Sequence, residues 1–192
     1  MRTPKIETER LILRRWRGSD AKDFFSYAKD PRVGPPAGWP PHKSVLKSWW
    51  VIQHYRRQSW LWAIQHKETG RVIGCVGLYH DYNRRESMSI HRELGFSMDP
   101  NFWGKGLMKE ACLAVMECGF REQELEELTL YHLCDNHRCS ALAKRLGFRP
   151  CYKIHNAMPT WDGRMCDCIA NAIKRKNLIG CDDETENQEN RK

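Results

Sequence analysis

The sequence predicts a single α/β domain built on a mixed, mostly antiparallel sheet. Two observations support this. Segments that alternate polar and apolar residues, typical of half-buried strands, are interleaved with segments whose apolar residues recur at helical spacing. The first half of the chain contains a hairpin-type connection at 68–71, whereas in the second half strand and helix signals alternate. The first half is therefore expected to be antiparallel, and the second half to follow a β-α-β-α-β order.

The first half has strand and helix signals separated by a proline-rich loop. A run at 9–16 alternates like a half-buried strand, and Ser19-Asp20 offers an N-cap for the short amphipathic helix that follows and ends near Asp30-Pro31. Five of the nine prolines fall within 31–41, which favours a stiff, ordered loop carrying Trp39 over a regular element. Ser44 offers an N-cap for the next helix. The remaining expected elements of this half are a helix at 45–58 and strands at 60–66 and 71–80.

The second half alternates strands, turns and helices. A long strand runs into Gly104-Lys105-Gly106, after which apolar residues recur at helical spacing. A later strand leads through Asn136 into a helix that Gly147 ends. The expected elements are a strand at 88–98, a helix at 107–120, a strand at 128–134, a helix at 137–146, a strand from 148 and a last strand at 164–173.

Length, composition and charge limit the possible classes of function. The 192 residues suit one domain at 1–175, followed by an acidic tail at 176–192 that we expect to be disordered. Neither a membrane span nor a signal peptide is apparent, so we expect a cytoplasmic protein with no membrane partner. The net charge of +8 suits a polyanionic partner such as nucleic acid, the ribosome or a phosphorylated cofactor, and scattered solvated lysines and arginines explain it equally well. Without a long Lys/Arg block or an aromatic RNA-binding signature, direct nucleic-acid binding is not expected.

The nine cysteines do not form a recognisable metal or disulfide pattern. Their number is odd, and no C-x-x-C pair is present. We therefore favour buried free thiols in a reducing compartment over a zinc site, and expect no bound metal.

The most informative motif is the turn Trp103-Gly-Lys-Gly106, placed where a strand should end and a helix begin. Glycines let a ligand approach the backbone closely, and the helix start offers unsatisfied N–H donors and the positive end of its dipole. Such a turn can hold phosphate. A dinucleotide-binding motif would need a third glycine where Lys109 stands, and a P-loop would need Ser or Thr after Lys105. Neither nucleotide motif fits.

Further motifs accompany this turn in a fixed order. They are Thr8-Glu-Arg-Leu-Ile-Leu-Arg14, Asp30-Pro31, Gly70-Arg-Val-Ile-Gly74, Glu93-Leu-Gly-Phe96, Asn136-x-x-x-Ser140 and Leu146-Gly-Phe148. Together, over about residues 6–174, they resemble the GNAT superfamily of acyl-coenzyme A N-acyltransferases. The nearest branch is that of bacterial enzymes that acetylate the N-terminal alanine or serine of ribosomal proteins. The resemblance implies six or seven strands, a V-shaped splay between the central parallel strands, and helices on both faces of the sheet.

The resemblance also implies where acetyl-CoA, the expected cosubstrate, binds. The family's phosphate loop usually opens with Arg or Gln, where this chain has Asn101. The pyrophosphate would bind the backbone amides of Phe102, Trp103, Gly104, Lys105, Gly106 and Leu107. The pantetheine arm would pair with the strand end formed by Gly95, Phe96, Ser97 and Met98. Asn136 and Ser140 would contact the pantetheine and the thioester.

Amide formation from a thioester requires a base that removes a proton from the amine. Glu93 is the candidate, with a structural carboxylate as the alternative; His91 and Asp81 are weaker candidates. Ser140 is the candidate proton donor for the leaving thiolate, although it could instead bond its own helix backbone. Many relatives have a tyrosine acid seven residues after this asparagine, where this chain has Ala143.

The acceptor is the least determined part of the prediction. Trp39 and Trp50 are expected to line the acceptor side, although either could belong to the core. The acceptor is expected to be a protein N-terminal amine or a small amine, since the fold alone does not fix the substrate. The alternative to an acetyltransferase is a non-catalytic acyl-CoA-binding or protein-interaction module. A monomer or a homodimer is expected.

Overall fold

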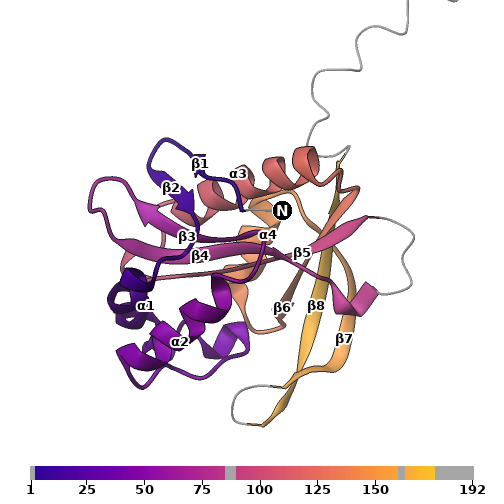
Figure 1. Ribbon diagram of the computed structural model, residues 1–192. Coiled ribbons are helices and arrows are strands. Elements are labelled where there is room, and N and C mark those ends of the chain that lie inside the picture. The colour runs from indigo at the N-terminus through magenta and orange to yellow at the C-terminus, as the bar shows by residue number, and fades with distance from the viewer. Residues whose placement is uncertain (1–2, 85–89, 160–162, 176–192) are drawn as a thin grey trace, which may run out of the picture.

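The computed structural model describes residues 3–84, 90–159 and 163–175, and these contain one eight-stranded sheet (Figure 1). The strands occur in the order β1-β2-β3-β4-β5-β6-β8-β7. Their bounds are β1 Ile6–Glu7, β2 Leu11–Arg14, β3 Leu61–His66, β4 Val72–Tyr79, β5 His91–Met98, β6 Glu127–Leu133, β7 Arg149–Pro159 and β8 Met165–Lys174. The mostly antiparallel mixed sheet is confirmed. The strand count exceeds the expected six or seven, and β1, only two residues long, is too short to show a period in the sequence.

The central pair, β5 and β6, is the only parallel pair among the described strands. Its register runs from His91 opposite Glu127 to Glu93 opposite Thr129 and then stops. Beyond that point β5 continues against β4, and β6 continues against β8. The two central strands therefore diverge toward their carboxyl ends, which confirms the expected splay.

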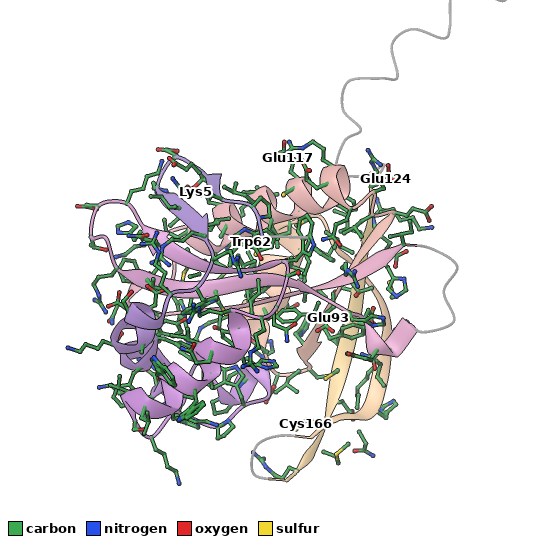
Figure 2. The ribbon with its side chains drawn as sticks, viewed as in Figure 1. Lys5, Trp62, Glu93, Glu117, Glu124 and Cys166 are labelled. Atoms are coloured by element: carbon green, nitrogen blue, oxygen red, sulfur yellow. The ribbon has the colours of Figure 1, made fainter. Side chains whose placement is uncertain are left out.

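Helices cover both faces of the sheet, as expected (Figure 1). The helices α1 (Ala21–Ala28) and α2 (Val45–Tyr55) pack with Cys75 of β4 in one buried cluster. The helices α3 (Leu107–Glu122) and α4 (His137–Arg145) pack with the opposite face in a second, larger cluster. Trp62 belongs to this second cluster; it is fully buried, and its indole N–H donates to the carbonyl of Pro4 at 2.6 Å (Figure 2).

The predicted helices and strands are present, with boundaries that differ by at most three residues where they lie in the described chain. Residues 88 and 89 of the predicted strand 88–98 and the predicted tail at 176–192 lie outside the described residues. The proline-rich loop contains one short 3₁₀ turn, Pro35–Ala37, because proline's fixed φ suits the start of a helical turn.

The helix caps show one correction. Ser44 caps α2 as predicted, since its hydroxyl accepts from the Lys47 amide at 3.1 Å. Asp20 does not cap α1 with its side chain. Its carboxylate is instead held by Arg14 of β2 through two hydrogen bonds of 2.9 Å, and by the Arg17 amide at 2.7 Å. Both partners are buried, so this ion pair joins the sheet to the first helical turn.

Breaking this pair tests how strongly it holds α1 against the sheet. We expect Asp20→Ala to lower the free energy of unfolding by about 3–5 kcal/mol, because it leaves the buried Arg14 guanidinium without its charge partner. Glu122→Ala is the control, since it removes an exposed partner of Arg121 and should leave stability nearly unchanged. Denaturant unfolding of both variants measures the difference; equal losses would contradict the assignment.

Candidate functional site

A cavity of about 860 Å³ lies at the divergence of β5 and β6. It is lined from both faces of the sheet, by Leu107 and Leu142 on the α3/α4 side and by Tyr55 and Cys75 on the α1/α2 side. Side chains alternate along a strand, so neighbouring residues of β5 reach opposite sides of the sheet. The cavity therefore passes through the sheet, at the gap where the two central strands lose their pairing.

The Gly-x-Gly turn lies at the α3 side of this cavity. Gly104 and Gly106 both have positive φ, 75° and 76°, a conformation that side chains other than glycine's disfavour. Gly106 is also the N-cap of α3, and because glycine has no side chain, it gives the helix start no side-chain cap. The first amides of a 16-residue helix are thus available to an anion at the cavity. The sequence-based prediction of a phosphate cradle is consistent with this geometry.

Asp99 and Trp103 fix the approach to this turn. Asp99 is buried, and its carboxylate accepts from the Asn101 backbone and side-chain amides, both at 2.9 Å. The Trp103 indole N–H donates to the Met98 carbonyl at 2.9 Å, which ties the turn back to the end of β5. Asn101 therefore stabilises the loop, at a position where the phosphate loop of the similar family usually has the longer Arg or Gln.

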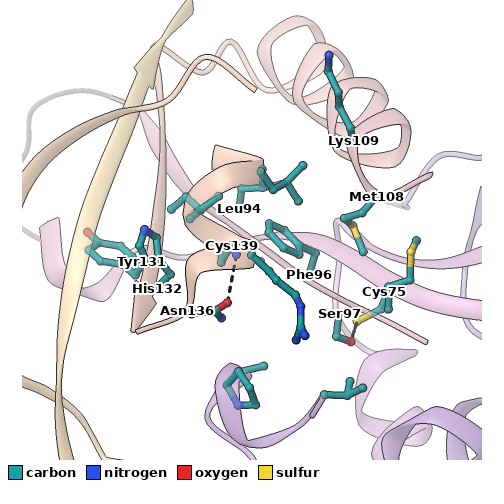
Figure 3. Close-up of a pocket in the computed structure, with 18 of the residues that line it drawn as sticks. Cys75, Leu94, Phe96, Ser97, Met108, Lys109, Tyr131, His132, Asn136 and Cys139 are labelled. Carbon is teal, nitrogen blue, oxygen red and sulfur yellow. Dashed lines mark hydrogen bonds between the residues drawn. The ribbon is translucent and has the colours of Figure 1, made fainter. Parts of the chain in front are cut away.

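Most of the predicted coenzyme-binding residues line the cavity (Figure 3). They are Gly95, Phe96, Ser97, Met98, Phe102, Trp103, Gly104, Gly106, Leu107 and Asn136. Lys105 is not among the lining residues, and its ammonium lies 5.2 Å from the centroid of the Phe102 ring. Asn136 caps α4, with its side-chain oxygen accepting from the Cys139 amide at 3.1 Å.

Ser140 is not brought to the cavity. It is exposed and absent from the lining, whereas Arg138, Ala141, Leu142 and Arg145 of the same helix line it. The expectation that Ser140 points the same way as Asn136 assumed helical geometry for both. Asn136 is the N-cap, with φ −81° and ψ 72°, so the helical spacing starts only at the next residue. From there Ser140 falls on the face opposite Arg138 and Leu142.

Sequence analysis did not identify the cations that line the cavity. These are Arg32 of the proline-rich loop, Lys109 of α3, and Arg138 and Arg145 of α4. The Arg138 and Arg32 guanidinium groups lie 4.5 Å and 5.8 Å from the Trp103 ring centroid, within the range of cation–π contacts. Only Lys109 gave a signal in the sequence, a cation just after the Gly-x-Gly turn. The others come from segments that only the fold brings to the turn.

Glu93 lies at the end of the stretch of β5 that pairs with β6 (Figure 2). It lines the cavity, and burial, followed by the charge of Asp81, raises its pKa to about 7. Such a carboxylate exchanges protons near neutral pH, as a general base requires. Asp81 is buried and absent from the lining, and its carboxylate accepts from the Thr129 hydroxyl at 2.7 Å and the Tyr131 hydroxyl at 3.0 Å. His91 is also absent from the lining.

Aromatic side chains surround Glu93 on the α1/α2 side. Those that line the cavity include Trp39, Tyr55, Tyr79 and Tyr131. Gly95 provides room for one of these rings, because a Cβ there would lie 2.8 Å from Cε2 of Tyr79. The predicted acceptor side therefore has one carboxylate among aromatic rings.

Trp50 does not contribute to this wall. Its side chain is 62% exposed, is absent from the cavity lining, and packs edge-on against Trp49 at 5.1 Å. The buried face of α2 is formed by Ser48 and Ile52, one turn apart, and Trp50 lies midway between them on the opposite side.

Other site types find no support in the part of the chain that the structure describes. No group of three or more His, Cys, Asp or Glu residues there could hold a metal ion, and every cysteine there is a free thiol. None of its helices has the length and apolar character needed to cross a membrane.

Comparison with known proteins identifies the family. The sequence model of the acetyltransferase (GNAT) domain matches residues 10–149. A curated relative, the uncharacterized N-acetyltransferase YoaA of Bacillus subtilis, is 25% identical over an alignment of 151 residues that covers 76% of this chain and 83% of the relative.

Solved structures agree on the fold. A GNAT-family acetyltransferase from Bacillus anthracis superimposes with a TM-score of 0.78 at 18% identity, covering 89% of this chain and 98% of that one. A ribosomal-protein-S5-alanine acetyltransferase from Vibrio fischeri has a TM-score of 0.69 at 20% identity, covering 91% and 98%. Since the family model spans most of the sequence, this chain belongs to the GNAT family of acetyl-CoA-dependent N-acetyltransferases.

Proposed function

We propose that this protein transfers an acetyl group from acetyl-CoA to a primary amine by direct attack within a ternary complex. The observation that carries the proposal is the position of Glu93. This carboxylate has a pKa of about 7 and lines the cavity where it passes through the sheet. Acetyl-CoA would approach from the cation-lined α3/α4 side, and the amine from the aromatic α1/α2 side. The thioester and the amine would then meet beside Glu93.

The reaction requires few groups from the protein. Glu93 removes a proton from the bound ammonium, and the amine nitrogen attacks the thioester carbonyl. The C–N bond forms, the C–S bond breaks, and coenzyme A leaves as a thiolate, while the nitrogen loses its second proton so that a neutral amide results. Free thiols ionise near pH 8.5, so this thiolate leaves readily and can take up that second proton through water. The mechanism therefore needs neither a cysteine nucleophile nor a proton from Ser140.

The lining also favours one class of amine among those open from sequence. Glu93 is the only carboxylate among the described residues that line the cavity. One carboxylate with aromatic walls suits an acceptor carrying a single positive charge, through ion pairing and cation–π contact. A peptide N-terminus or a simple monoamine meets this condition. A polyamine would leave further ammonium groups without partners.

The pH dependence of transfer tests Glu93 as the base. We expect kcat/KM for the amine to fall with unit slope below about pH 7, because the protonated carboxyl cannot accept a proton. Glu93→Gln should lower kcat/KM by about 100-fold or more and abolish that limb of the profile. Glu117→Gln, on the exposed surface of α3, is the matched control and should behave as wild type. Full activity in Glu93→Gln would show that another group is the base.

A panel of acceptors tests the charge argument. Peptides with a free N-terminal amine and simple monoamines should be acetylated with higher kcat/KM than spermidine. Release of free coenzyme A measures the rate, and mass spectrometry locates the acetyl group. Preference for spermidine over every monocationic amine would contradict the single-carboxylate argument.

Binding and turnover together separate the enzyme from a non-catalytic acyl-CoA-binding module. Acetyl-CoA should raise the melting temperature of the protein, and an accepted amine should then release coenzyme A. Stabilisation by acetyl-CoA without turnover on any amine would favour the binding module. No stabilisation at all would count against the proposed donor.

A further inference from the structure

Glu110, in the first turn of α3, is the centre of a hydrogen-bond cluster outside the cavity. Its Oε1 accepts from the Thr8 hydroxyl at 2.6 Å and from the Arg10 backbone amide at 2.9 Å. Its Oε2 accepts from Arg10 Nε at 2.7 Å, and Arg10 Nη2 lies 2.7 Å from the same oxygen in an ion pair. The Glu110 side chain is 16% exposed, and neither Glu110 nor Arg10 lines the cavity. The cluster joins the segment before β2 to the start of α3.

Arg10 also reaches the Gly-x-Gly turn itself. Its Nη1 donates to the carbonyl oxygen of Lys105 at 2.9 Å. The same guanidinium group therefore uses one edge for Glu110 and another nitrogen for the backbone of the turn. A planar fork with fixed donor directions can serve both partners at once, which a lysine ammonium on its flexible stem cannot reproduce.

This contact fixes the direction of one peptide group. In a trans peptide, the carbonyl and the following N–H point to opposite sides. Because Arg10 holds the Lys105 carbonyl, the Gly106 N–H must point away from Arg10. Gly106 lines the cavity, whereas Lys105 and Arg10 do not. The held peptide thus presents its N–H toward the cavity side of the turn.

The negative charge of Glu110 is a second reason for its contact with Arg10. A carboxylate in the first turn of α3 is favourable to the helix dipole but would repel a pyrophosphate bound at that helix start. Burial opposes ionisation of Glu110, yet the hydrogen bonds from Thr8 and Arg10 outweigh it and lower its pKa, so the group is charged. The ion pair with Arg10, whose Nε and Nη2 both contact Oε2, neutralises this charge on the side away from the cavity.

We propose that Arg10 is a positioning residue for the phosphate-binding turn: anchored by Glu110, it holds the Lys105–Gly106 peptide so that its amide faces the pyrophosphate of acetyl-CoA. This inference rests on the proposed function, and it gives the opening motif Thr8-Glu-Arg10 a role in binding the donor. Arg10 touches neither substrate, so its effect should appear in donor affinity and leave the chemical step unchanged.

Two donors that differ in the pyrophosphate provide the test. Acetyl-CoA carries the pyrophosphate, whereas S-acetylpantetheine lacks it and the nucleotide. We expect Arg10→Met to raise KM and Kd for acetyl-CoA about tenfold or more, with kcat retained, and to leave kcat/KM for S-acetylpantetheine unchanged. Arg121→Met, at the exposed far end of α3, is the matched control and should leave both donors unaffected.

Arg10→Lys separates position from charge, and it also serves if Arg10→Met does not fold. It keeps the positive charge near the turn but loses the two-edged contact, so its acetyl-CoA affinity should fall close to that of Arg10→Met. Wild-type affinity in Arg10→Lys would overturn the proposal in favour of simple electrostatic attraction. Equal losses for both donors would also overturn it, by showing a general structural defect. If the wild-type protein bound no acetyl-CoA, the proposed function itself would fail.

Discussion

The divergence of β5 and β6 is the constraint on which the rest of the structure depends. Their parallel pairing ends at Glu93 and Thr129, although both strands continue, each with its other neighbour. Strand edges normally need hydrogen-bond partners, and an extended amide-bearing chain such as pantetheine can supply them. The same gap opens a passage between the two faces of the sheet. Without it, the loop on one face and the carboxylate on the other would belong to separate sites.

The two faces differ in charge and in how they are built. On the α3/α4 side, a glycine turn, a helix start and several cations favour a phosphorylated donor. On the α1/α2 side, aromatic rings and a poorly solvated carboxylate favour an ammonium and its deprotonation. Structural contacts outside the cavity support each side: Arg10 contacts both Glu110 and the Lys105 carbonyl of the turn, and the charge of Asp81 adds to burial in raising the pKa of Glu93.

The order of elements and the donor loop were predictable because they depend on local signals. Alternation and helical spacing indicated the strands and helices, and two glycines marked the turn at 104–106. The main error in the predicted site concerned the face of a helix on which a residue lies. Ser140 and Trp50 lie on outward faces of α4 and α2. The position of the N-cap residue sets the rotation of α4, and the buried residues set the rotation of α2. Arg32 and Arg138 were missed because tertiary packing alone brings them to Trp103.

The most direct test of this account is a crystal structure of the protein with coenzyme A and a monoamine bound. The account predicts that pantetheine passes through the sheet between β5 and β6, with its sulfur emerging beside Glu93 and the amine among the aromatic rings. A coenzyme bound wholly on the α3/α4 face, with its sulfur remote from Glu93, would contradict it.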